Sequence, residues 1–201
     1  MAWVALAGMA LFLLGSVVVR RTLGRIHRGI RFVLLDPRRW SATERMTGVA
    51  GVLGVGSLVA GAVAAGVGHG GPAVHLSRAW GWSGAGLRAA GTALMTWAQL
   101  SMGPSWRVGV DHDHTTTLVS RGPFRLVRNP IYAAMLGGFG GSALLVPSLW
   151  EAVGWTVLLG ALQGQVRAVE EPFLLNAHGS DYRQWARRTG RFVPRLGTLG
   201  R

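Results

Sequence analysis

The sequence predicts an all-α integral membrane protein with five transmembrane helices and a cofactor pocket at its cytoplasmic face. Hydrophobic residues make up 49% of the 201 residues and charged residues only 14%, which is unusual for a soluble domain. All 21 basic side chains are arginine, against eight acids. Three arginine-rich blocks alternate with apolar segments, as cytoplasmic loops alternate with spans in membrane proteins. Composition and charge pattern therefore agree on a membrane bundle.

The apolar segments define the five expected helices and their direction. They cover about residues 3–19, 47–67, 85–102, 131–146 and 149–168. Arg20 and Arg21 follow the first segment and no basic residue precedes it, the reverse of a secretory signal peptide. We therefore expect the N-terminus outside, with 19 of the 21 arginines and the C-terminus on the cytoplasmic side. A bacterial cytoplasmic (inner) membrane is the expected location.

The chain is expected to divide into two parts within one domain. Residues 1–97 hold the first helices and a basic segment, 20–46, whose amphipathic start fits a helix in the headgroup region. A solvated basic loop is the alternative for that segment. Residues 98–201 form the second part, with a helical hairpin at 131–168 and a cytoplasmic tail. Packing of small residues, such as Gly137 and Gly141, is expected to hold the helices together.

Charge and composition also exclude several classes of function. The net charge of +13 is distributed as in a membrane protein, so anionic lipid headgroups explain it better than nucleic acid does. No cysteine is present, which excludes disulfides and thiolate metal ligands. The run Asp111-His112-Asp113-His114 is expected to be a solvated loop, and we predict no metal site.

Two polar motifs at the ends of the hairpin predict a site. Arg128-Asn129-Pro130-Ile131-Tyr132 precedes the hairpin, and Glu170-Glu171 follows it. At 1.5 Å per residue, each helix is about as long as the ~30 Å hydrocarbon core. A hairpin of that length returns the chain to the face it left. The arginine motif and the acidic pair should therefore meet at one membrane interface.

The order of these motifs resembles the isoprenylcysteine carboxyl methyltransferase family and, more distantly, membrane phospholipid methyltransferases. The resemblance covers about residues 98–196 and rests on these positions: Gly122, Phe124, Arg128, Pro130, Tyr132, Glu170, Glu171, Gly179, Tyr182, Trp185, Phe192 and Pro194. Asn129 stands where the eukaryotic-type motif has histidine. An asparagine cannot titrate near neutral pH, so a general base at that position is in doubt.

The resemblance implies S-adenosylmethionine as cofactor. Arg128 is expected to bind a carboxylate of cofactor or substrate, because a guanidinium is an always-charged, bidentate partner. Glu171, or alternatively Glu170, would bind its ribose or amino groups. The full expected cofactor set is Gly122, Phe124, Arg128, Asn129, Pro130, Tyr132, Glu171 and Tyr182. Arg128 and Glu170 are the expected catalytic residues, and Gln163, Arg167 and Trp185 the expected substrate contacts.

The implied reaction is methylation of the carboxylate of a lipophilic, isoprenoid-like or other amphipathic acceptor from the bilayer. A carboxylate is already ionised at neutral pH, so this reaction needs alignment rather than a base. A hydroxyl or amine acceptor would need a base, and Glu170 is the nearest candidate. Membrane lipids are the other expected partners, and the sequence leaves the oligomeric state open.

Two rivals remain open from the sequence. One is an NADPH-dependent membrane reductase resembling the C-terminal part of sterol reductases. The other is a non-catalytic membrane scaffold, in which Arg128 is a membrane anchor and the acidic pair neutralises Arg167 or Arg183. In that case Tyr132, Tyr182 and Trp185 would be interfacial aromatics.

Overall fold

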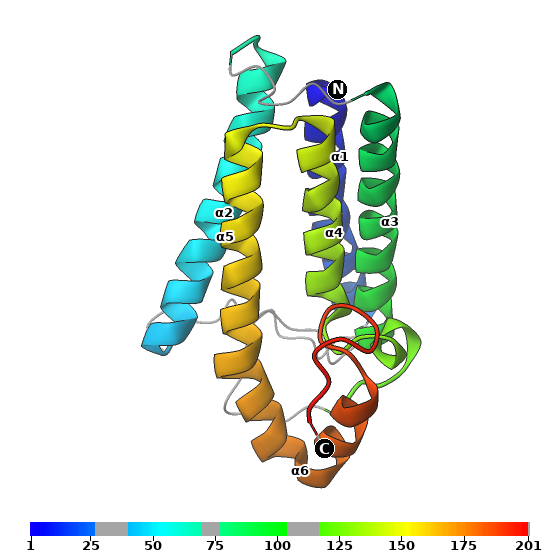
Figure 1. The fold of residues 1–201 in the computed structure, drawn as a ribbon. Helices are drawn as coiled ribbons and strands as arrows, with labels where there is room; N and C mark the ends of the chain where they lie inside the picture. The colour runs from blue at the N-terminus through cyan, green and yellow to red at the C-terminus, as the bar shows by residue number, and fades with distance from the viewer. Residues whose placement is uncertain (27–39, 70–76, 104–116, 201) are drawn as a thin grey trace.

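The computed structural model describes residues 1–26, 40–69, 77–103 and 117–200, which form a helical bundle without strands in these ranges (Figure 1). Its elements are α1 (Ala2–Ile26), α2 (Ala42–Gly66), α3 (Arg78–Met102), a 3₁₀ turn η3 (Gly122–Arg125), α4 (Pro130–Leu145), α5 (Leu149–Gln165), a π turn η4 (Val166–Glu170) and α6 (Glu171–Arg188). The all-helical class is confirmed, and the five predicted segments are helical in the structure.

Several helix boundaries differ from those predicted. α1 continues to Ile26, so residues 20–26 extend the first helix instead of starting an interfacial one, and residues 27–39 lie outside the described residues. α3 begins at Arg78, well before the predicted position 85. The apolar pattern misses its first two turns because they are rich in polar and small residues. The predicted domain boundary at residues 97 and 98 falls inside this helix.

Two of the described helices are long and apolar enough to cross a membrane, at Ala2–Val19 and Ala42–Gly66. The helix α4 is apolar but shorter. The structure therefore supports a membrane protein, while the number of crossings and their direction stay predictions.

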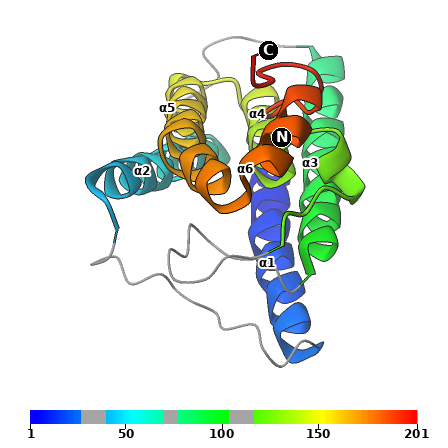
Figure 2. The ribbon, with the colours of Figure 1, turned by 90° about the horizontal axis from the view of Figure 1, so that it is seen from below.

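The long helices associate as two closely packed pairs. α3 packs along α4, and α2 packs along α5, with α1 against α3 (Figures 1 and 2). Glycines allow these close contacts: a Cβ on Gly91 would lie 2.8 Å from the carbonyl oxygen of Ala134, and one on Gly154 would lie 2.8 Å from that of Gly54. Of the two glycines predicted to pack, Gly141 does so, since a Cβ there would lie 2.5 Å from the carbonyl oxygen of Gly84, whereas one on Gly137 would lie 3.8 Å from Cδ1 of Leu87.

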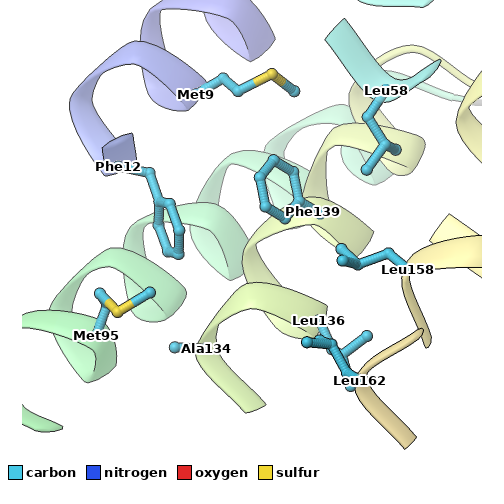
Figure 3. Close-up of a cluster of buried hydrophobic side chains, with 9 residues drawn as sticks. All are labelled: Met9, Phe12, Leu58, Met95, Ala134, Leu136, Phe139, Leu158 and Leu162. Carbon is cyan, nitrogen blue, oxygen red and sulfur yellow. The ribbon is translucent and has the colours of Figure 1, made fainter. Parts of the chain in front are cut away.

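The apolar core lies where the two pairs and α1 meet. Phe12 of α1 and Phe139 of α4 pack with ring centroids 5.6 Å apart. Figure 3 shows the cluster that surrounds them, formed by Met9, Phe12, Leu58, Met95, Ala134, Leu136, Phe139, Leu158 and Leu162. The core thus contains side chains from each of the helices α1 to α5.

The predicted tail contains a sixth helix, α6, which bends back toward the bundle. Gly179 has φ +52° within it, a left-handed conformation that glycine adopts without steric cost. After α6, residues 189–199 run beside residues 121–129, with hydrogen bonds from Arg128 N to Gly190 O (2.7 Å) and from Asn129 N to Arg191 O (3.1 Å). We call these two segments the C-terminal cap; Figure 1 shows the C-terminus at the end of the bundle opposite the N-terminus.

Candidate functional site

The two polar motifs meet at the capped end of the bundle. The hydroxyl of Tyr132 donates to Glu170 Oε1 at 2.5 Å, and Arg128 Nη2 lies 2.7 Å from Glu171 Oε1. The helical hairpin α4–α5 therefore returns the chain to the end it left. The predicted meeting of the motifs is confirmed.

Arg128 is held at both terminal nitrogens by groups of the protein, whereas its Nε has no hydrogen-bond partner among the described residues. Its side chain is 1% exposed, and Nη1 donates to the carbonyl oxygens of Ala186 (2.9 Å) and Thr189 (2.5 Å). Nη2 donates to Gly197 O (2.8 Å) as well as to Glu171. The carbonyls at a helix C-terminus lack partners within the helix, so the guanidinium supplies partners where α6 ends. The geometry gives Arg128 a role in holding the cap together.

Glu171 joins that guanidinium to a second one. Arg191 donates to it from Nε and Nη2, both at 2.9 Å, in a bidentate pair. Burial alone would raise the pKa of Glu171, but the hydrogen bonds and charges of Arg191 and Arg128 outweigh burial and hold this pKa below its ordinary value. Glu171 is thus an ionised carboxylate between two arginines.

The cap should consequently be sensitive to acid. Because the pKa of Glu171 is lower in the folded than in the unfolded protein, its stabilising effect is complete above the ordinary value of 4.5 and is lost as the pH falls through the lowered folded value. We expect the melting temperature in detergent to drop as the pH falls below 4.5 and through the lowered pKa of Glu171. Glu171→Gln should be less stable at pH 7 and should lose part of this pH dependence. Parallel pH curves for the two proteins would contradict the assignment.

Glu170 has the opposite environment, although it is the adjacent residue. Its hydrogen-bond partners among the described residues are Tyr132 and Gln165, both neutral. Burial raises the pKa of this carboxyl above its usual value, against the weaker opposing effect of the two hydrogen bonds. No arginine compensates Glu170 in the part of the chain that is described. This carboxylate is therefore available to a cation or a proton.

Three residues contact Glu170 or one of its two hydrogen-bond partners, and the sequence gives none of them a site role. Thr47 of α2 donates to Gln165 Oε1 at 2.6 Å, and the ring of Phe192 packs edge-on against Tyr132 with centroids 6.4 Å apart. We call Thr47, Tyr132, Gln165, Glu170 and Phe192 the Glu170 cluster. Gln165 was detectable as an amide inside an apolar helix, and Phe192 as a motif residue. Thr47 carries no signal, because one threonine at a helix start is ordinary.

Four other predicted cofactor or substrate residues lie in or beside the cap. Gly122 has φ +59°, and a Cβ there would overlap with Ser101. The carbonyl of Phe124 accepts from Trp185 Nε1 at 3.1 Å, and Trp185 packs on Tyr182 with centroids 5.6 Å apart. Burial, followed by the charge of Glu171, raises the pKa of Tyr182 to about 12. The contacts of these four residues therefore lie within the C-terminal cap or beside it.

The remaining predicted residues fall into two groups. Asn129 and Pro130 start α4, and Asn129 Nδ2 donates to Arg191 O at 3.3 Å, which ties the helix start to the cap. The exposed Arg167 of η4 donates from Nε to Gln163 Oε1 of α5 at 3.2 Å. Asn129 and Pro130 thus lie near Tyr132 at the start of α4. The contact between Gln163 and Arg167 lies outside the Glu170 cluster.

No group of three or more metal-ligating His, Cys, Asp or Glu side chains occurs among the described residues. The run Asp111–His114 lies outside the described residues.

Comparison with known proteins adds two findings. The model of the phospholipid methyltransferase family matches residues 80–181, which is half of the chain and includes the hairpin with both polar motifs. The cobalt-zinc-cadmium resistance protein CzcN of Cupriavidus metallidurans is 34% identical over 80 residues. That alignment covers 40% of this chain and 37% of the relative.

Proposed function

The chain belongs to the phospholipid methyltransferase family, and from that premise we propose that it uses S-adenosylmethionine to methylate a lipophilic acceptor within a membrane. Membership supports a membrane methyltransferase over the NADPH reductase and the scaffold considered from the sequence. Cofactor, acceptor and orientation are the finer parts of the proposal.

The choice of cofactor rests on Glu170, whose carboxylate has only neutral hydrogen-bond partners among the described residues. S-adenosylmethionine contains a sulfonium and an ammonium, and a buried carboxylate with only neutral partners favours such cations. Tyr132 donates to this carboxylate, the ring of Phe192 packs against Tyr132, and aromatic rings also attract cations. Glu170, Tyr132 and Phe192 would therefore hold this group, while Glu171 keeps the cap closed around them.

The carboxylate of Glu170 also guides the choice of methyl acceptor. When bound, S-adenosylmethionine supplies a methyl group to a nucleophile and leaves as a neutral thioether. A carboxylate acceptor, implied by the resemblance, would meet the like charge of Glu170. An amine or hydroxyl must lose a proton when it is methylated, and Glu170 can accept that proton. The geometry favours an amine or hydroxyl on a lipophilic molecule over a carboxylate.

The two ends of the bundle support the proposed orientation. Exposed arginines gather on the elements of the capped end: Arg45, Arg121, Arg125, Arg167, Arg183 and Arg187. Of the five exposed tryptophans in the described residues, Trp97 lies on α3 toward the capped end, and four lie at the helix ends of the opposite side: Trp3, Trp80, Trp82 and Trp150. Arginine favours the cytoplasmic side and tryptophan the membrane interface. The Glu170 cluster would then face the cytoplasm of a bacterial inner membrane.

The test is methyl transfer from labelled cofactor into a lipid extract, using detergent-solubilised protein. We expect the label to enter a lipid-soluble product and to remain there after mild base. Release of the label as methanol would identify a carboxyl methyl ester and overturn the acceptor assignment. Binding of NADPH without binding of S-adenosylmethionine, measured by calorimetry, would overturn the proposed function as a whole.

A further inference from the structure

A second polar group lies in the bundle away from the capped end. It consists of Arg88 of α3, Ser142 of α4 and Glu151 of α5, which are 4%, 0% and 0% exposed, and we call it the internal polar cluster. Ser142 is ten residues beyond Tyr132 on α4, or about 15 Å along the helix. The cluster is therefore separate from the Glu170 cluster.

The charges of the internal polar cluster are only partly satisfied by the protein. Arg88 Nη2 donates to Ser142 Oγ, and the guanidinium lies 5.3 Å from the centroid of the Phe139 ring. Arg88 Nε and Nη1 and both carboxylate oxygens of Glu151 have no hydrogen-bond partner among the described residues. The two opposite charges nevertheless attract each other electrostatically. Four buried polar atoms thus remain, two of them donors and two acceptors.

Glycines of three helices make room for these two long side chains. A Cβ on Gly8 of α1 would overlap with Cδ of Arg88, and one on Gly141 of α4 would lie 3.3 Å from its Cβ. A Cβ on Gly61 of α2 would lie 3.5 Å from Cγ of Glu151. A side chain at Gly8 would push the Arg88 side chain aside, one at Gly141 would collide with the backbone of α3, and Gly61 lies in ordinary contact with Glu151. The helices therefore approach closely around the cluster.

Buried charged groups without hydrogen-bond partners are costly, and bound water can offset that cost. Leaving an ion unpaired in an apolar interior costs several kcal/mol, whereas a buried water makes about three hydrogen bonds to such groups. Water can accept from the guanidinium of Arg88 and donate to the carboxylate of Glu151 in one position. Nonpolar molecules match neither charge.

We propose that the internal polar cluster binds water between Arg88 and Glu151, and that this hydrated charge pair links the α3–α4 pair to the α2–α5 pair. The two pairs have few other polar links in the described residues. Trp155 of α5 donates to Leu136 O of α4 at 2.9 Å, and Tyr132 donates to Glu170 at the capped end. The charge pair supplies the link near the opposite end. This role is independent of methyl transfer.

A double-mutant cycle on Arg88 and Glu151 tests the pairing. Arg88→Leu and Glu151→Leu alone each leave the other polar group buried without its partner, and each should lower the melting temperature in detergent by roughly 6–20 °C. The double variant should melt higher than either single variant. If only the double variant can be recovered folded, that result also supports the pairing of Arg88 with Glu151. Losses that add up, or a double variant that cannot be recovered folded, would overturn the pairing.

The control cycle combines Arg88→Leu with Gln99→Leu. Gln99 is also buried on α3, 1% exposed, but it bonds Ser16 of α1 and carries no charge. It lies eleven residues from Arg88, about 16 Å along the helix, so these two losses should add. Coupling of equal size in the control would assign the effect to general packing and overturn the proposal.

Radiolytic hydroxyl-radical labelling in ¹⁸O water tests the water itself. Radicals formed from bound water should oxidise Phe139, which is 1% exposed and lies under the Arg88 guanidinium. The double variant should lose this labelling, while Leu58, buried in the same core, stays unlabelled in both proteins. Absence of label on Phe139 in the unmodified protein would show a dry pair and overturn the water site.

Discussion

Arg128→Ala is expected to release the C-terminal cap and to lower the free energy of unfolding by about 3–5 kcal/mol, the usual cost of removing one partner of a buried ion pair. Alanine removes the guanidinium donor from the carbonyls of Thr189 and Gly197, leaves the carbonyl of Ala186 with only Leu199 N as donor, and leaves Glu171 with one arginine in place of two. The measurements are thermal unfolding in detergent and amide hydrogen exchange, which should become faster in residues 186–199.

Arg125→Ala is the matched control for that variant. Arg125 lies three residues earlier and is exposed, so its removal should change stability by no more than about 0.5 kcal/mol. Arg128→Lys should recover only part of the stability, because an ammonium cannot reproduce the fork of donors. Unchanged stability and exchange in Arg128→Ala, together with lost cofactor binding, would return Arg128 to the ligand-binding role expected from the sequence.

Glu170→Gln is expected to lower kcat by about 10²–10⁴-fold at saturating cofactor, because an amide of the same shape cannot accept a proton. The protonated form of Glu170 is equally inactive as a base. In the unmodified protein kcat/KM should therefore rise as the pH rises through the pKa of Glu170, which burial places above 4.5. The variant should lack this rise. Rates measured with labelled cofactor across pH provide both tests.

Tyr132→Phe is a second variant that tests the role of Glu170 as a base. The Tyr132 hydroxyl stabilises the ionised carboxylate of Glu170 and lowers its pKa, so removing it should move the rise in kcat/KM to higher pH while keeping the reaction. A Glu170→Gln enzyme with normal kcat and an unchanged pH profile would instead mean that the acceptor is already ionised. The carboxylate acceptor implied by the resemblance would then be favoured.

The sequence predicts those parts of the fold that depend on hydropathy and helix length. An apolar hairpin of two similar helices must bring its ends together, which is why the meeting of Arg128 with Glu171 could be anticipated. The start of α3 at Arg78 could not, because its first turns combine polar and small residues with exposed tryptophans. The helix α6 is hidden in the same way, since Gly179 interrupts its pattern.

The candidate site was harder to predict than the fold, because many of its contacts involve backbone atoms. Arg128 reads as a ligand-binding arginine in the sequence, yet its partners include three carbonyl oxygens, which any residue type can offer. The two acids of the motif look equivalent in the sequence. Only the tertiary structure distinguishes Glu171, held by two guanidiniums, from Glu170, held by neutral groups.

The π turn at Val166–Glu170 has a consequence for how the enzyme evolves. Neighbouring residues on a helix point about 100° apart, and this widened turn ends between the two acids. One acid is thereby directed inward to anchor the cap, and the other toward Tyr132. Substitutions that tune reactivity at Glu170 can accumulate without loosening the anchor. An insertion or deletion in these five residues would disturb both at once, so this short stretch should tolerate changes of side chain far better than changes of length.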